Sequence, residues 1–357
     1  MIPNRSPAAQ TARRGIVHMD PIALNKALVA LDTPTGAEAP ATDLLEQVLA
    51  SRGYHVQRQP VLPGRDNLYA YREPPELVFT THLDCVPPYV PLREDATTIW
   101  GRGSCDAKGQ AAAMIAAAEQ LAAEGERRVG LLFVVGEEDG SEGAQASVTL
   151  EPRGRFLING EPTEGRLVVG QKGALRVMVS ATGRAAHSGY PEEGESALLP
   201  LLDTLERLRH LPLPVDERLG PCTLNIGTVT AGAAPNVIPP SAVAQLLIRT
   251  VGPSAALREA IQACAAPGVS ISFPLEIPHY RATEPPPPGW ETTVVSYGSD
   301  LPFLGAWGIG YQMGPGTIRV AHTEHEHILK ADLLDGVQRY ARLAKDLLAT
   351  IPPAGST

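Results

Sequence analysis

Six residues near the C-terminus, His322 to His327, read HTEHEH and hold three histidines and two glutamates. Imidazole and carboxylate groups together are ligands that Zn²⁺ and related divalent ions take. The cluster alone is weak, because its spacing differs from His-Glu-x-x-His and because histidine-rich runs also occur on solvated surfaces. A metal centre here therefore needs further ligands elsewhere in the chain.

Four more groups of acids and histidines stand where apolar runs end. They are THLDCVP with His82 and Asp84, GRGSCDAKGQ with Asp106, VVGEEDGSEG with Glu137 and Glu138, and LINGEPTEG with Glu161. Each acid alone is most simply a cap or a surface group. In open α/β sheets, however, ligands bind at the ends of strands, so the groups together indicate one metal centre. The adjacent pair Glu137-Glu138 fits a hydrolase, with one carboxylate on the ion and the other free to deprotonate a water.

The elements that must position these groups follow from apolar periodicity. Helical spacing predicts helices over 21–32, 41–53 and 111–125, and short apolar runs predict strands over 76–84 and 128–138. The runs are apolar on both faces, which is typical of a buried, mostly parallel sheet with helices on both faces. The first half of the chain is therefore predicted to be α/β.

The pattern changes after Gly173. Alternating runs and amphipathic stretches predict, in order, strand, helix, strand, strand, helix and strand over 174–183, 196–211, 223–232, 242–252, 254–266 and 268–277. That order is the split βαβ plan of a small α+β, ferredoxin-like sandwich. We predict a catalytic domain of residues 20–172 and 282–352, an inserted lid and dimerisation domain of residues 173–281, and a flexible tail of residues 1–19.

Composition excludes several classes of protein. Of 357 residues, 43% are hydrophobic and 19% charged, as in a globular protein. The net charge of −9 argues against a nucleic-acid partner. No apolar run is long enough to span a bilayer, and the N-terminal residues lack the apolar segment of a secretory signal. Four cysteines without a C-x-x-C pair are expected to be buried thiols in a reducing cytoplasm.

Eight short motifs occur in a fixed order: H-x-D, G-R-G-x-x-D-x-K-G, G-E-E, E-P-T, A-x-H-S-G-x-P, N-V-I-P, G-P-G and A-H-x-x-x-E. This order resembles the di-zinc amidohydrolase and metallopeptidase family of acetylornithine deacetylase, succinyl-diaminopimelate desuccinylase, aminoacylase and carboxypeptidase G. The resemblance runs from about Ala23 to the C-terminus. This resemblance implies a metal centre, a substrate site and a function, beside what each residue indicates alone.

The family pattern implies a site with two zinc ions per subunit, for which Co²⁺ is an alternative. One ion is held by His82, Asp106 and Glu161, and the other by Asp106, Glu138 and His322, with Asp106 bridging the two. Glu137 is the general base, and Asp84 orients the ring of His82.

Relatives also have a cis peptide bond after the bridging aspartate, here between Asp106 and Ala107. The match of AHTEHEHI to A-H-x-x-x-E makes His322 the ligand and leaves His325 and His327 at the surface. Glu326 then takes the family's acidic position, either as a helix cap or as support for a ligand. The rival interpretation puts His325 on the metal.

The inserted domain carries its own polar residues. His187 matches the histidine that, in relatives, crosses a dimer interface to stabilise the oxyanion; read alone, it is a turn residue. Asn236 and Arg249 are expected to hold a substrate carboxylate, although Arg249 alone could be an ordinary strand residue with an extended side chain. The backbone of Gly314 and Gly316 either offers donors to the substrate or only makes a turn.

The implied function is metal-dependent hydrolysis of an N-acyl-L-amino acid by a cytoplasmic homodimer, of the acetylornithine or acetyl-lysine deacetylase type in amino-acid biosynthesis. The alternatives are a dipeptidase, carboxypeptidase or desuccinylase of the same family, and, in another class, a non-catalytic metal-binding scaffold. An intact Glu137 favours the enzyme. The chain departs from the family pattern at Gln110, where relatives often have glycine, and in the short, proline-rich segment 281–297.

Overall fold

The computed structural model describes residues 19–351, which form two lobes, each with its own hydrophobic core. The larger lobe contains a six-stranded sheet in the order β1-β2-β6-β3-β7-β17. Its strands are β1 (His55–Leu62), β2 (Arg65–Tyr71), β6 (Val129–Val134), β3 (Leu77–His82), β7 (Phe156–Gly160) and β17 (Ile309–Met313). The last four run parallel, whereas β1 and β2 form an antiparallel hairpin at one edge.

Helices cover both faces of this sheet, as the apolar runs predict. One face packs against α1 (Pro21–Val29), α2 (Ala39–Ser51), α3 (Lys108–Ala123) and α7 (Lys330–Leu348). The other face is covered more thinly, by α4 (Glu142–Ser147) and the short 3-10 turns η2 (Leu301–Phe303) and η3 (Gly305–Trp307). Alternate residues of β3 serve the two faces: Phe79 belongs to the first core and Val78 to the second.

Two small sheets complete the larger lobe and its junction. One has the order β18-β5-β4 and the other β15-β8-β16. Their strands are β4 (Arg93–Glu94), β5 (Thr98–Trp100), β18 (His327–Leu329), β8 (Leu167–Gln171), β15 (Tyr280–Arg281) and β16 (Thr292–Val295). A two-stranded piece joins β10 (Val215–Asp216) to β11 (Gly220–Pro221) in the smaller lobe.

The smaller lobe is the inserted domain. Its four strands are antiparallel in the order β12-β13-β9-β14, and they are β9 (Ala174–Thr182), β12 (Thr223–Ala231), β13 (Ser241–Arg249) and β14 (Val269–Ile277). Helices α5 (Leu198–Arg209) and α6 (Ala255–Gln262) cover one face, and the other face is open. The predicted split βαβ order and the α/β plus inserted α+β fold class are confirmed.

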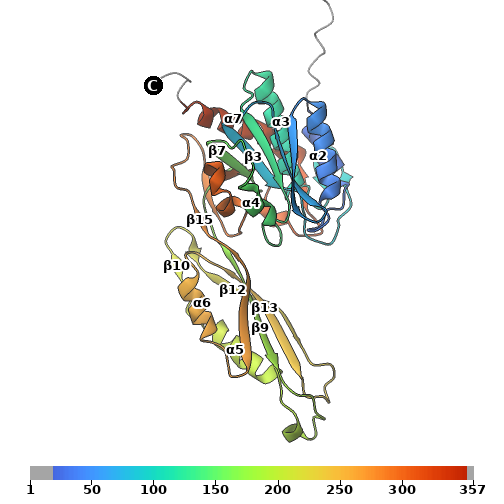
Figure 1. The fold of residues 1–357 in the computed structure, drawn as a ribbon, viewed down its shortest axis with the longest axis vertical. Coiled ribbons are helices and arrows are strands. Elements are labelled where there is room, and N and C mark those ends of the chain that lie inside the picture. Colours follow the sequence, from blue (N-terminus) through green and yellow to red (C-terminus); the bar gives the residue numbers. More distant parts are fainter. Residues whose placement is uncertain (1–18, 352–357) are drawn as a thin grey trace, which may run out of the picture.

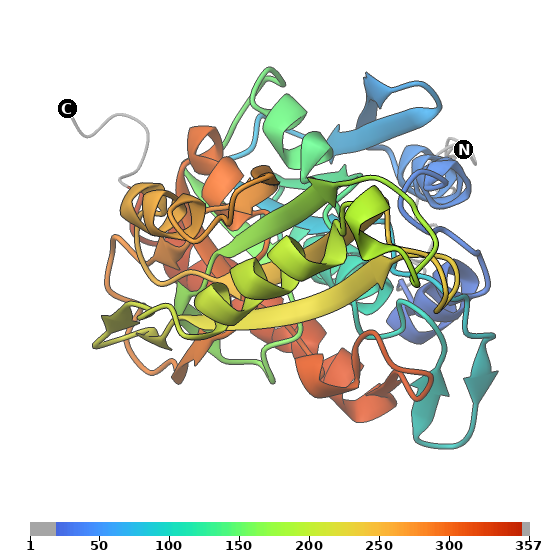
Figure 2. The same ribbon diagram turned by 90° about the horizontal axis from the view of Figure 1, so that it is seen from below.

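The two lobes lie end to end in Figure 1 and overlap when the molecule is viewed from below in Figure 2, so the molecule is elongated. Where they join, Gly173 and Thr250 exchange two backbone hydrogen bonds, of 2.9 and 3.1 Å. We propose that the domain boundaries lie at this junction, after residues 172 and 281. Most of the predicted tail, residues 1–18, lies outside the described residues.

Two further expectations concern the whole chain. Within residues 19–351, none of the helices combines the length and the hydrophobicity that crossing a bilayer requires. All four cysteines are buried free thiols, as expected. A cytoplasmic location stays a prediction.

Candidate functional site

The predicted metal-site residues come together at one edge of the large sheet. His82 ends β3, Glu137 and Glu138 follow β6, and Glu161 follows β7. These strands are parallel neighbours, so their carboxyl ends meet at one edge. Asp106 reaches the same place from the loop before α3.

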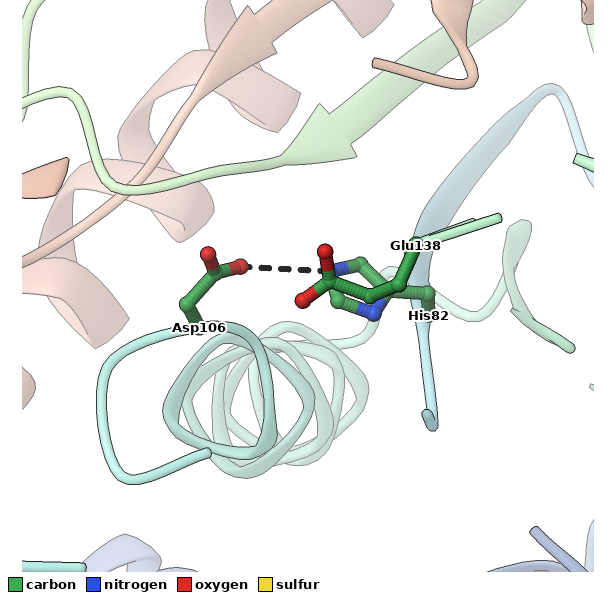
Figure 3. Close-up of side chains that lie close together, drawn as sticks. All are labelled: His82, Asp106 and Glu138. Atoms are coloured by element: carbon green, nitrogen blue, oxygen red, sulfur yellow. Dashed lines mark hydrogen bonds and ion pairs between the residues drawn. The ribbon is translucent and has the colours of Figure 1, made fainter. Parts of the chain in front are cut away.

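The centre of the cluster is made of His82, Asp106 and Glu138, each of which offers one ligand atom within 4.8 Å of the others. Figure 3 shows the three side chains converging, with His82 Nε2 3.2 Å from Asp106 Oδ1. His322 closes the group from the C-terminal side, with its Nε2 3.1 Å from Glu138 Oε1 and 3.5 Å from Asp106 Oδ2. His325 instead lies on the surface beside Glu324, so the geometry favours His322 over its rival.

Asp84 holds this edge of the site together. Its carboxylate is fully buried and accepts hydrogen bonds of 3.1 to 3.2 Å from the backbone N–H groups of residues 136–138. It also accepts from Thr35 Oγ1 at 2.8 Å, and its Oδ1 lies 3.4 Å from His82 Nδ1. His82 Nδ1 also lies 3.0 Å from the backbone oxygen of Asp84. Asp84 fixes the loop that presents Glu137 and Glu138, and its role in orienting the His82 ring stays a prediction.

Glu326 has a role that its position in the sequence only partly indicated. Its side chain is buried, and its Oε1 accepts from the backbone N–H groups of Gly103, Cys105 and Asp106 at 2.9, 3.3 and 3.2 Å. Its Oε2 lies 2.6 Å from Arg102 Nη1. Glu326 is thus no helix cap. It ties the loop that carries Asp106 to the segment that carries His322, four residues earlier.

The charges of the cluster are unbalanced without a cation. Burial raises the pKa of Glu137, Glu138 and Glu161 above the ordinary glutamate value. Hydrogen bonds to Asp106 and Glu138 raise the pKa of His322 to about 10. Glu161 Oε1 is buried and has no hydrogen-bond partner among the described residues. A buried acceptor left unpaired, beside several carboxylates and imidazoles, fits a divalent cation of the zinc type.

A pocket of about 300 Å³ opens over these groups. Its floor is Asp106, Glu137, Glu138, Glu161 and His322, and its other walls are Val86, Ala174, Arg176, Leu247, Arg249, Leu275, Ile277, Tyr297, Gly298 and Ile318. The wall residues from β9, β13 and β14 place the inserted domain directly over the cluster. Arg249 was predicted at this place, whereas Arg176 and Tyr297 were missed.

The Gly314-Pro315-Gly316 turn lies behind the pocket wall. The Gly314 N–H donates to Thr163 Oγ1 at 3.0 Å, so it is already used inside the protein and its predicted role as a free donor is wrong. The turn needs glycine for another reason, because a Cβ on Gly314 would lie 2.0 Å from Gln110 Oε1. Gln110 Nε2 donates to Pro315 O at 2.9 Å. For Gly316, the donor role stays a prediction.

His187 and Asn236 are far from the pocket of their own chain. Strand β9 begins at the pocket with Ala174, and its nine residues rise about 3.3 Å each, so Thr182 lies about 26 Å away. His187 follows beyond Thr182, where the Ser188 N–H donates to Asn236 O at 3.0 Å. This end is the tip of the inserted domain, lowest in Figure 1.

Comparisons with known proteins identify the family of this chain. The model of peptidase family M20/M25/M40 matches residues 78–346, which is most of the chain. The chain belongs to this family. A peptidase M20 domain-containing protein of Schizosaccharomyces pombe is 38% identical over 341 residues, covering 90% of this chain and 83% of the relative. A probable carboxypeptidase of Emericella nidulans is 36% identical over 396 residues, covering 96% and 93%.

Solved structures of peptidases share the fold. The di-peptidase Dug1p of Saccharomyces cerevisiae has a TM-score of 0.74 at 14% identity, covering 93% of this chain and 96% of that one. An M20 family metallo-carboxypeptidase of Sulfolobus solfataricus has a TM-score of 0.72 at 15% identity, covering 91% and 98%. The predicted family is confirmed, and the chain is a hydrolase of a metallopeptidase family with a candidate metal site.

The peptide bond between Asp106 and Ala107 is cis, as the resemblance predicts. His322 has a left-handed backbone with a φ of 63°, which is uncommon for a residue with a side chain. The segment 281–297, expected to be trimmed, contains only β16 and the end of β15 between its loops. None of these features removes a predicted metal-site residue.

Proposed function

We propose that this M20 protein is a zinc-dependent hydrolase that cleaves the amide bond next to a free α-carboxylate. The observation that carries the proposal is one pocket containing both Glu137 and Arg249. Among the described residues, no carboxylate lies within ion-pair distance of the partly buried Arg249, although the charge of Glu137 acts on its guanidinium. A guanidinium left free beside a hydrolytic centre is suited to bind a substrate carboxylate.

Five residues would hold two zinc ions. His82, Asp106 and Glu161 would bind one ion, and Asp106, Glu138 and His322 the other. When bound, such ions polarise an amide carbonyl and lower the pKa of a bound water. The roles of the individual ligands rest on the convergence of their side chains at the sheet edge and on the unpaired Glu161 Oε1.

Glu137 is the proposed general base. It follows β6, lines the pocket and is not among the proposed ligands, so its carboxylate is free to take a proton. It would accept the proton of the attacking water and deliver it to the leaving nitrogen. Burial raises the pKa of Glu137, and a cation held by the neighbouring ligands would favour the ionised carboxylate that a base requires. Arg249 would hold the α-carboxylate and so align the amide over the floor of the pocket.

His187 and Asn236 are proposed to act on the pocket of a second copy of the chain. Their distance from their own pocket leaves them no substrate to contact there. In a symmetric dimer the tip of one inserted domain can reach the other subunit's site, and the same patch is then buried twice. His187 would donate to the oxyanion, and Asn236 would help to bind the carboxylate.

Two substrate groups present an amide beside a free carboxylate. Short peptides are the first candidate, because several relatives are named probable carboxypeptidases. That name implies cleavage at a C-terminus, and an enzyme that acts in this way on two-residue substrates is a dipeptidase. N-acyl amino acids, including acetylornithine and acetyl-lysine, are the second candidate, because Arg249 would grip them in the same way. Desuccinylation remains a variant of the second group.

A matched pair of substrates tests the proposal. The purified protein with zinc is assayed on an N-acetyl dipeptide with a free C-terminus and on the same compound with a C-terminal amide. We expect cleavage of the free acid and a large loss with the amide, because Arg249 then has no anion to bind. Acetylornithine, acetyl-lysine and unblocked dipeptides in the same assay separate the two substrate groups. Equal cleavage of the acid and the amide would overturn the carboxylate role, and no cleavage of any compound would overturn the proposed activity.

A further inference from the structure

The roof of the pocket is the open face of the inserted sheet, and strand register decides which side chains stand side by side there. Arg176 on β9 is paired with Leu247 on one side and Leu275 on the other. One step nearer the junction, Ala174 is paired with Ile277. Arg249 lies two residues beyond Leu247, so it points to the same face of the sheet.

Arg176 does not offer a free charge to a ligand. Its Nη1 lies 2.9 Å from Asp139 Oδ1, in the loop directly after Glu138. The pair is partly exposed, so the ion pair is weak and can be broken. While it is formed, Asp139 neutralises Arg176, and Arg249 is the unpaired cation among the described pocket residues on the inserted sheet. A second anionic group on the substrate would therefore have to compete with Asp139.

The remaining roof is aliphatic. Leu247, Leu275 and Ile277 surround the position next to Arg249, and Val86 and Ile318 face it from the larger lobe. Ala174 is paired with Ile277 across the neighbouring strands β9 and β14. Because Ala174 is small, it leaves room there for a side chain of the substrate between larger neighbours. A charged side chain placed there would lose its hydration without gaining a partner.

We propose that the substrate residue that carries the free α-carboxylate has an apolar side chain, and that Ala174, Leu247, Leu275 and Ile277 set this preference. The inference rests on the proposed function, because it takes Arg249 as the carboxylate site. Because each methylene that fits an apolar pocket changes kcat/KM by about 10- to 200-fold, the preference for leucine over glycine should be at least about ten-fold.

A substrate series tests the preference. Dipeptides of the form Gly-X, with X as glycine, alanine, leucine, glutamate or lysine, are compared by kcat/KM with the zinc-loaded protein. We expect leucine to exceed both glutamate and lysine by about ten-fold or more, as for a side chain that fills an apolar pocket. A kcat/KM for lysine or glutamate that equals or exceeds that for leucine would overturn the inference while leaving the hydrolase intact. Absence of cleavage of this series and also of the N-acyl amino acids named above would overturn the proposed function and this inference together.

Asp139→Asn tests whether Asp139 neutralises Arg176. Breaking the pair frees Arg176, so the ratio of kcat/KM for Gly-Glu to that for Gly-Leu should rise about five-fold, as expected for a weak surface pair. Asp216→Asn is the matched control, because it breaks the ion pair between Asp216 and Arg281 outside the pocket. It should leave the ratio unchanged. An unchanged ratio in Asp139→Asn, with normal metal content, would contradict the role given to Arg176.

Ala174→Val and Ile277→Ala change the size of the aliphatic recess in opposite directions. The first should lower kcat/KM for Gly-Leu about ten-fold and leave Gly-Gly nearly unchanged, since only the larger side chain reaches the recess. The second should raise the value for Gly-Phe relative to Gly-Leu. Two changes with parallel effects on all substrates would show that these residues do not contact the side chain.

Discussion

The two ends of the inserted sheet differ in what they face. At the end near β9 residue Ala174, the side chain of Arg249 lines a pocket with a cluster of acids and a histidine of the same chain. At the other end, His187 and Asn236 lie beside each other on an exposed tip with no metal-site residue nearby. One chain therefore contains every proposed metal ligand, the proposed base Glu137 and the carboxylate-binding Arg249. The tip, in contrast, acquires a function only if it contacts another chain.

Glu137→Gln is the change in the pocket with the largest expected effect on activity. The amide cannot accept the proton of water, so kcat should fall by about 10²- to 10⁴-fold. Metal analysis should still find two ions per chain, because Glu137 is not a proposed ligand. Glu124→Gln, which changes an exposed glutamate paired with Lys345, is the control and should keep full activity. Near-normal turnover of Glu137→Gln with full metal content would remove the residue from the mechanism.

His322→Ala tests which histidine of the HTEHEH run belongs to the site. Its Nε2 lies within 3.5 Å of both Asp106 and Glu138, so its loss should remove one metal ion and lower activity by about 10²-fold. His325→Ala and His327→Ala are matched controls from the same run and should keep both ions. Metal content of the three purified variants is the measurement. Loss of metal from His325→Ala alone would move the site by three residues.

Glu326→Ala should weaken metal binding by about 10- to 100-fold, because the loop with Asp106 loses the acceptor of three backbone N–H groups. Glu326→Gln keeps an acceptor oxygen and should recover part of the affinity. Chelator competition measures the affinity, and the Tm of the metal-free protein measures stability separately.

Glu119→Gln is the control for Glu326. It breaks another carboxylate contact with an arginine, 2.6 Å from Arg72 Nη2, on the last turns of α3 and outside the pocket. Both changes should lower the Tm, but only the change at Glu326 should alter metal affinity. If the two variants bind metal equally well, Glu326 serves stability alone.

The convergence of the metal-site residues was largely predictable from the sequence, and the reason is the topology of the sheet. His82, Glu138 and Glu161 each lie at or just after the carboxyl end of a buried parallel strand. The carboxyl ends of parallel strands meet at one edge of the sheet, whatever the order of the strands in the chain. The pairing of His322 with this edge came from the family resemblance, because no periodicity connects it to β6.

Residues that depend on register or on local hydrogen bonds were less predictable. Arg176 enters the pocket because β9 lies between β13 and β14, a pairing of segments up to about a hundred residues apart that no local pattern reveals. Gly314 was assigned a free N–H, but the hydroxyl of Thr163 takes it, a contact across 151 residues. Glu326 carried a signal, its spacing from His322, but the three amides that it accepts from were not visible in the sequence.

The dimeric, shared site is the central claim, and subunit complementation tests it most directly. His187→Ala and Glu137→Gln proteins, each inactive alone, are mixed under conditions that exchange subunits. If His187 acts on the partner's pocket, each mixed dimer has one site that lacks both residues and one intact site, so activity should return toward about a quarter of the wild-type value at equal mixing and random exchange. If each chain uses its own His187, both sites of every mixed dimer remain damaged. No recovery of activity in a mixture shown to have exchanged subunits would contradict the account.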